Sequence, residues 1–119
     1  MQNNEPLISI ILPLFNAQKY IKDCIKSVIN QTYSNWELII VDDASTDDSI
    51  NIVSRLMLRD SRIKLIECKE NFGGPAKPRN IGIKKSNGLY VAFLDNDDIW
   101  LPEKLKKQME IFFKNKEID

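Results

Sequence analysis

The chain has 119 residues, of which 43% are hydrophobic and 29% are charged, and this composition is typical of one ordinary globular domain. Its 17 basic and 17 acidic residues give a formal net charge of zero, which excludes a general electrostatic attraction to nucleic acid or a polyanionic surface. Histidine is absent, so any metal must be held by oxygen ligands and any acid–base chemistry must use carboxylates or lysine.

The first half of the chain predicts two strand–helix units. Residues 7–15 are a nearly continuous apolar run rich in isoleucine, which is typical of a strand covered on both faces. Apolar residues then recur at helical spacing over residues 18–30, with charged residues between them, and predict an amphipathic helix. Residues 36–43 repeat the buried-strand pattern and end in two carboxylates. Residues 45–47 supply N-cap candidates for a second helix.

The second half predicts two more such units. Residues 62–68 alternate between apolar and polar and indicate a third strand with less cover on one face. The turn-forming residues 71–75 precede a short helix over residues 76–86. Residues 89–95 predict a fourth strand, and a proline after it marks the start of a last helix.

Strands that alternate with helices predict parallel βαβ units, and therefore a single α/β domain with an open, mainly parallel sheet and helices on both faces. In such sheets, ligands bind at the carboxyl ends of the strands. The first strand ends at Phe15, the second at Asp42 and Asp43, and the fourth runs into the acidic residues 95–98. One rim of the sheet is therefore expected to hold an aromatic ring and two acidic patches.

The cysteines and the N-terminal residues bear on the compartment. Cys24 and Cys68 lie in apolar surroundings and do not form a CxxC pair, which predicts two reduced core thiols. No apolar run reaches the roughly 18 residues that a membrane span needs, and residues 1–6 do not resemble a signal peptide. We therefore expect a cytoplasmic protein, or the cytosolic part of a larger one.

The acidic cluster at residues 95–98 favours a metal site. If the fourth strand stays extended through it, Asp95 and Asp97 face the same side. Two carboxylates suit Mg²⁺ or Mn²⁺, with substrate phosphates and waters as the other ligands. The alternative is a solvated turn that caps the last helix. An EF-hand is excluded, because Trp100 and Lys106 stand where its loop glycine and closing glutamate belong.

Two other segments each allow two interpretations. Asp42 or Asp43 could cap the following turn, or accept a hydrogen bond from a ring N–H such as that of uracil while Phe15 stacks on the same base. Alone, Phe15 is expected in the core. Residues 71–82 match neither a P-loop nor a dinucleotide fingerprint. Their two glycines and Arg79 at a helix start favour an anionic ligand, and a basic solvated helix start is the alternative.

Taken together, these motifs resemble the nucleotide-sugar-binding half of the family 2 glycosyltransferases, which have the GT-A fold. The resemblance is carried in order by ISIILPLFNAQKYIKDCIKSVINQTYSNWELIIVDDASTDDS, NFGGPAKPRNIGI and GLYVAFLDNDDIWLP. It runs from about Leu7 to Met109, which is nearly the whole chain. The fold expected from it is the Rossmann-like half of a GT-A domain.

The resemblance implies roles for the acidic cluster. The family's DxD metal motif matches Asp95, Asn96 and Asp97. Asp97 is then the ligand of a Mg²⁺ or Mn²⁺ that bridges the donor diphosphate, and Asp95 lies near the ribose and the metal's water shell.

The resemblance also implies a nucleotide pocket. The family's base pocket maps onto Pro13, Phe15 and Asp43, with Asp43 as the partner of the uracil ring N–H. Arg79 takes the position of a family arginine near the nucleotide. Asp42 falls in a matching acidic position, without an assigned role.

The implied reaction is transfer of a sugar, with inversion, from a nucleoside diphosphate donor to a hydroxyl of a carbohydrate or lipid-linked acceptor. A UDP-sugar is the expected donor, and polysaccharide or glycoconjugate synthesis is the expected setting. In relatives the catalytic base and acceptor-binding segment lie downstream of the DxD motif. Because this chain stops at Asp119, we expect an N-terminal donor-binding fragment that is inactive alone and that can self-associate.

Two alternatives belong to other classes. One is a nucleotide-binding module without catalysis. The other is a receiver-type signalling domain, which also gathers aspartates at strand ends. The receiver interpretation is weaker because the acidic pairs follow the second and fourth strands, whereas the first strand ends in Phe15 and Asn16.

Overall fold

The computed structural model describes residues 5–118, in which strands and helices alternate along the chain. The strands are β1 (Ile8–Leu14), β2 (Trp36–Asp42), β3 (Ile63–Glu67) and β4 (Tyr90–Phe93). They pair in the order β3-β2-β1-β4, and all three pairs are parallel. The predicted open parallel sheet is confirmed.

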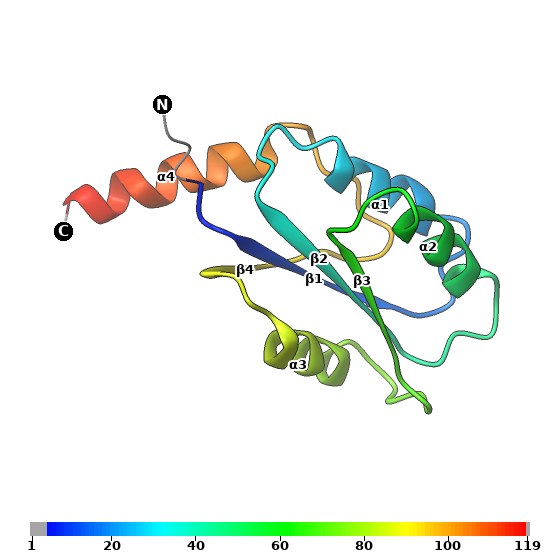
Figure 1. The fold of residues 1–119 in the computed structure, drawn as a ribbon. Helices are drawn as coiled ribbons and strands as arrows, with labels where there is room; N and C mark the ends of the chain where they lie inside the picture. The colour runs from blue at the N-terminus through cyan, green and yellow to red at the C-terminus, as the bar shows by residue number, and fades with distance from the viewer. Residues whose placement is uncertain (1–4, 119) are drawn as a thin grey trace.

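Helices cover both faces of this sheet, as the sequence predicts. They are α1 (Ile21–Ile29), α2 (Ser49–Met57), α3 (Ala76–Lys85) and α4 (Lys104–Ile118). Figure 1 shows α1 and α2 on one face and α3 on the other, while α4 extends outward from one end of the sheet. The α/β class is therefore confirmed.

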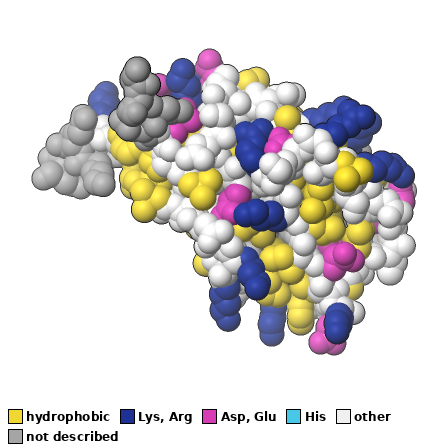
Figure 2. Space-filling model, viewed as in Figure 1, with side chains coloured by type: hydrophobic (Ala, Val, Ile, Leu, Met, Phe, Trp, Pro, Cys, Tyr) yellow, Lys and Arg dark blue, Asp and Glu magenta, His cyan; other side chains and the backbone are white. Residues whose placement is uncertain are grey.

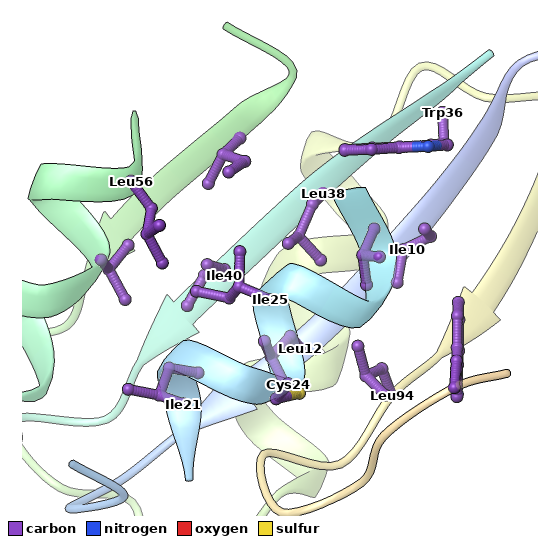
Figure 3. Packing of buried hydrophobic residues seen from close by; sticks show 14 of the residues in the cluster. Ile10, Leu12, Ile21, Cys24, Ile25, Trp36, Leu38, Ile40, Leu56 and Leu94 are labelled. Carbon is purple, nitrogen blue, oxygen red and sulfur yellow. The ribbon is translucent and has the colours of Figure 1, made fainter. Parts of the chain in front are cut away.

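The core lies on both sides of β1 and β2, where all but one of the 14 strand residues are buried. On one face, Ile10 and Leu12 belong to a large cluster that includes Ile25 of α1 (Figure 3). On the other face, Ile11 belongs to a smaller cluster against which Ile81 of α3 packs. Burying a side chain of this size contributes about 1.5–3 kcal/mol. The continuous isoleucine-rich runs of the central strands follow from this two-sided cover.

Two helices begin later than the sequence predicts. α1 begins at Ile21 because the carbonyl of Ala17 first accepts backbone N–H groups in a turn. The N-cap of α2 is Asp48, so the expected cap one to three residues earlier is wrong. Asp47 still acts at this helix start, since its Oδ1 accepts the N–H of Ser49 at 2.9 Å.

β4 ends at Phe93, two residues before its expected end. The N–H of Leu94 still donates to the carbonyl of Ile11 at 3.0 Å, and the chain then turns, with the N–H of Asp98 donating to the carbonyl of Asp95 at 3.0 Å. The condition under which Asp95 and Asp97 would face the same side of an extended strand is therefore not met. A turn spreads the crowded carboxylates toward solvent, where their mutual repulsion is weaker.

A buried carboxylate ties the connection between α3 and β4 to the central strands. Glu37 of β2 accepts hydrogen bonds from Lys64 Nζ at 2.9 Å, Ser9 Oγ at 2.5 Å and the N–H of Asn87 at 2.7 Å. The Ser9 hydroxyl accepts in turn from the N–H of Gly88 at 2.8 Å. Burial opposes ionisation of Glu37, but these hydrogen bonds outweigh it and lower its pKa.

The longest helix, α4, packs on the core through its first part, and the ring of Phe112 also contacts the ring of Tyr90 in β4, with centroids 4.5 Å apart. Leu105 and Met109 are buried, whereas Ile111, Phe112 and Phe113 are exposed. Within residues 5–118, neither this helix nor any other has the length and apolar character that crossing a membrane requires.

Candidate functional site

A cavity of about 490 Å³ opens at the carboxyl end of the sheet. It lies between the ends of β1 and β2, the loop before α3, and the turn after β4. Five of the residues singled out from the sequence line it together, namely Pro13, Phe15, Asp43, Asp95 and Asp97. Because parallel strands end at one edge, residues more than 80 positions apart in the chain meet here.

The ring of Phe15 is available to a ligand. Its side chain is 45% exposed, so the expectation that it lies in the core when considered alone is wrong. β1 ends at Leu14, and the next residue but one, Asn16, has a φ of 45° that turns the chain. Asn16 holds this turn, because its Oδ1 accepts the N–H of Thr46 at 2.8 Å. The ring is therefore presented at the cavity instead of continuing the strand.

Asp43 is a buried carboxylate that faces the cavity. Its residue is only 4% exposed, and its N–H donates to the carbonyl of Leu14 at 2.8 Å, which fixes the backbone beside β1. Its Oδ1 accepts the N–H of Phe72 at 2.9 Å. A carboxylate held in this way accepts a ligand N–H without first having to be ordered.

Asp42 has a different environment from that of its neighbour. It is fully buried and is not among the cavity-lining residues. Its Oδ2 accepts the N–H of Ser45 at 3.0 Å, while its Oδ1 has no hydrogen-bond partner among the described residues. The hydrogen bond to Ser45 agrees with the first interpretation of the sequence, in which Asp42 caps the following turn. The structure does not bring Asp42 to the cavity with Asp43.

The turn after β4 is attached to the core beneath it. The thiol of Cys24 in α1 donates to the carbonyl of Asp95 at 3.4 Å, and Asn96 Nδ2 donates to the carbonyl of Pro13 at 3.5 Å. Backbone and neutral side-chain groups make these contacts. The Asp95 and Asp97 carboxylates therefore stay exposed at the cavity.

Cys24 acts here as a neutral hydrogen-bond donor. Burial first, and then the charges of Asp98, Asp97 and Asp95, raise the pKa of its thiol to about 12. Both cysteines are free, as expected, but only Cys24 is in the core, since Cys68 is only partly buried. Thiolate chemistry is thus disfavoured beside the acidic turn.

Arg79 of α3 lies beside the cavity without lining it. Its Nη2 is 3.2 Å from Asp95 Oδ1, and its guanidinium lies 5.5 Å from the centre of the Phe93 ring. The Asp95 side chain is 61% exposed, so water screens this ion pair and its contribution to stability is small. The pair can therefore open when an anionic group arrives.

The acidic turn fits a hard divalent cation as part of a shared site. Within residues 5–118, no three His, Cys, Asp or Glu side chains are grouped so that they could hold a metal by themselves. Asp95 and Asp97 nevertheless supply exposed carboxylates at one cavity. Mg²⁺ is commonly held by one or two carboxylates together with substrate phosphates, so this donor set suits a cation that binds along with a phosphate ligand.

Asn71 in the loop before α3, and Pro78 in the first turn of α3, line the cavity although the sequence pattern did not single them out. Gly73, one of the two glycines noted in the sequence, lines the cavity as well, and its φ of 85° favours glycine. Asn96 also lines it. The signal in the sequence was an asparagine two residues before a Gly-Gly-Pro turn, since asparagine side chains often bond the backbone two residues on.

Comparison with sequence families and curated proteins identifies relatives over almost the whole chain. The model of "Glycosyl transferase family 2" matches residues 9–118. An uncharacterized glycosyltransferase of Haemophilus influenzae is 47% identical over 112 residues, which are 94% of this chain and 44% of that protein. The putative teichuronic acid biosynthesis glycosyltransferase TuaG of Bacillus subtilis is 46% identical, over 92% of this chain and 43% of TuaG. The chain thus spans less than half the length of these relatives.

Solved structures agree with the sequence relatives. S. aureus TarS 1-349 in complex with UDP is 34% identical and superposes with a TM-score of 0.84, covering 90% of this chain and 32% of that one. The mannosyltransferase PcManGT of Pyrobaculum calidifontis, in complex with GDP-Man and Mn²⁺, is 27% identical with a TM-score of 0.74, covering 80% and 28%. These matches, together with the parallel sheet, show that the chain belongs to glycosyl transferase family 2 and has the GT-A fold.

Proposed function

We propose that this chain is the donor-binding part of an inverting glycosyltransferase that transfers a sugar from a UDP-sugar to an acceptor hydroxyl in polysaccharide or glycoconjugate synthesis. One observation carries the proposal. An aromatic ring, a buried carboxylate and an acidic turn, supplied by Phe15, Asp43 and residues 95–97, line the same cavity. Uridine diphosphate carries a flat base, a ring N–H and a diphosphate, which the ring of Phe15, the Asp43 carboxylate and a cation at the acidic turn would complement.

The base and the diphosphate occupy opposite ends of the cavity in this proposal. Asp43 accepts the imide N–H of uracil, and Phe15 stacks on the ring. The start of α3 and Arg79 face the diphosphate, where helix N–H groups and a guanidinium favour negative charge. The exposed ion pair between Arg79 and Asp95 is exchanged for contacts to the donor.

Asp97 and Asp95 would hold Mg²⁺ or Mn²⁺ against the diphosphate. When bound, the cation would stabilise the negative charge that builds on the leaving diphosphate. The family neighbour PcManGT was solved with Mn²⁺ and a nucleotide sugar, which supports this assignment by analogy.

A UDP-sugar is preferred as donor because of the relatives. WfgD of Escherichia coli, 46% identical over 92% of this chain, is named a UDP-Glc:alpha-D-GlcNAc-diphosphoundecaprenol beta-1,3-glucosyltransferase. TarS was solved with UDP-GlcNAc. We propose that the acceptor site and its carboxylate base lie in the part of the family domain that this chain does not span.

Calorimetric titration with UDP tests the site. We expect UDP to bind more tightly with Mn²⁺ than without it, and Asp97→Asn to remove most of that gain, roughly tenfold or more in Kd for loss of a charged metal ligand. Asp23→Asn, at an exposed carboxylate of α1, is the matched control and should keep the metal effect. Binding of UDP that ignores both Mn²⁺ and Asp97→Asn would contradict the metal assignment.

A further inference from the structure

A closed set of hydrogen bonds joins Asp43 to the loop before α3. Asn71 Nδ2 donates to the backbone carbonyl of Asp43 at 3.0 Å, and Asn71 Oδ1 accepts the N–H of Gly73 at 2.8 Å. Between them, the N–H of Phe72 donates to Asp43 Oδ1 at 2.9 Å. We call the loop residues 71–73 with these bonds the Asn71 latch.

The latch depends on one side chain and one backbone conformation. The amide of Asn71 is the only group in it that bonds both to β2's end and to its own loop, so it sets the path of the chain between them. Gly73 has a φ of 85°, a conformation that L-residues rarely adopt. With both in place, the N–H of Phe72 points at the Asp43 carboxylate. The Asn71 latch thereby determines that Oδ1 is the oxygen of Asp43 that accepts a hydrogen bond from the protein.

This engagement matters for the choice of base. With Oδ1 bonded to Phe72, the Asp43 carboxylate has Oδ2 without a hydrogen bond from the described residues. Uracil presents a single imide N–H between two carbonyls, and one free acceptor oxygen satisfies it. Guanine presents two adjacent donors, N1–H and the exocyclic amine, which pair best with both oxygens of a carboxylate. Cytosine offers an acceptor at its ring nitrogen, which repels a carboxylate oxygen placed there, and its exocyclic amine is the donor that remains.

We propose that Asn71 is a positioning residue that makes the Asp43 site select uracil over guanine. It acts through the Phe72 N–H, by occupying one oxygen of Asp43 and orienting the other toward the cavity. This proposal rests on the proposed function, because it names the base that the same site accepts. It assigns the selectivity to the loop conformation and not to Asp43 alone.

Titrations of UDP and GDP, each with Mn²⁺, test the latch with two variants. Asn71→Ala removes two of its hydrogen bonds, and Gly73→Ala disfavours its backbone conformation while the added Cβ meets no protein atom within 4 Å. We expect each to weaken UDP binding roughly tenfold, the equivalent of one hydrogen bond to a charged group. GDP binding should stay equal or become tighter, because both oxygens of Asp43 become available to its two donors.

The ratio of UDP affinity to GDP affinity is the decisive measurement. If Asn71 only stabilised the loop, its substitution would weaken the binding of both nucleotides equally and leave this ratio unchanged. Asn51→Ala is the matched control, because Asn51 makes a local side-chain bond to Asp48 on α2 and should leave the ratio unchanged. Thermal unfolding of each variant shows whether it is folded. The latch is refuted if Asn71→Ala lowers the ratio but folded Gly73→Ala does not, since Asn71 would then contact the base directly.

Two further results separate this inference from the proposed function. If the wild-type chain binds UDP and GDP equally well, the latch fails as a selector but the nucleotide site stands. If the wild type binds neither nucleotide, the proposed function fails and the latch fails with it. If the wild type prefers UDP and this preference falls in both Asn71→Ala and Gly73→Ala, the result supports both the proposed function and the role of the latch.

Discussion

The carboxylates of Glu37 and Asp43 lie toward opposite ends of β2 and are both almost fully buried. Glu37 has protein donors on both oxygens, whereas Asp43 has a donor on only one. A buried carboxylate whose hydrogen bonds are all supplied by the protein stabilises the fold, and one with an oxygen left over can bind a ligand. Substitution of Glu37 is therefore expected to change the stability of the fold, and substitution of Asp43 is expected to change ligand binding.

Glu37→Gln should lower the free energy of unfolding by roughly 2 kcal/mol at neutral pH, because it weakens hydrogen bonds to a charged acceptor. The pKa of Glu37 is lower in the folded protein than the ordinary 4.5, so its stabilisation is present above about pH 4.5 and is lost as pH falls through the folded value. The difference between wild type and variant should therefore shrink on acidification.

Urea unfolding at pH 7 and near pH 3 measures this difference. Glu67→Gln, at an exposed carboxylate on the neighbouring strand β3, is the matched control and should stay within about 0.5 kcal/mol of wild type. A difference between wild type and Glu37→Gln that grows on acidification would show that the assigned hydrogen bonds do not control the titration of Glu37.

At the scale of elements, α3 determines how close its N-terminal loop comes to the cavity. This helix packs on β1 and β2 through a glycine, and a Cβ added at Gly82 would lie 2.6 Å from Ile11 Cγ2 and 3.4 Å from Val41 Cγ2. Ile11 is fully buried in β1, so it has little room to move away. The close approach of α3 to the sheet thus requires a residue without a side chain at this position.

Gly82→Ala should lower the free energy of unfolding by about 1–2 kcal/mol, because overpacking of a buried contact outweighs the gain in helix propensity. UDP affinity should fall as well, since the loop that carries Asn71 is displaced with the helix. Denaturant unfolding and calorimetry measure the two effects. Lys84→Ala, on the exposed side of the same helix, should change neither, and a stabilised Gly82→Ala would contradict the packing argument.

At the scale of the whole molecule, apolar side chains are uncovered near β4 and α4. β4 is an edge strand whose Val91 and Phe93 are 40% and 49% exposed, and Leu89 just before it is 70% exposed. Hydrophobic side chains also gather at the α4 end in Figure 2, beside the grey residues. An unpaired edge strand with exposed apolar residues favours association with another chain.

We expect the chain to self-associate as its concentration rises, and light scattering measures this. Val91→Lys should reduce the association, because a charge on the edge strand disfavours edge-to-edge pairing. Leu58→Lys is the matched control, since Leu58, at the C-terminal cap of α2 and away from β4, is 89% exposed. A monomer at every accessible concentration would contradict the expectation.

Much of this molecule follows from local patterns. The isoleucine-rich runs of β1 and β2 predicted strands with cover on both faces, because such runs are stable only when both faces are buried. Alternation of strands and helices predicted the parallel sheet, and parallel strands bring their carboxyl ends to one rim. The sequence alone therefore predicts that Phe15, Asp43 and the acidic residues 95–97 lie together.

Only the tertiary structure decided the features that depend on contacts between residues far apart in the chain. The turn at Asp95 depends on Cys24 and on the end of β1, and the different environments of Asp42 and Asp43 depend on Phe72, which lies about 30 positions away. Local propensity carries no information about such partners. The sequence by itself determined the fold and the residues at the rim, because these follow from periodicity, and it pointed to the family through the resemblance of its ordered motifs. Only the folded chain decided which oxygen of which aspartate is left for a ligand, because that depends on hydrogen bonds made across the sheet edge.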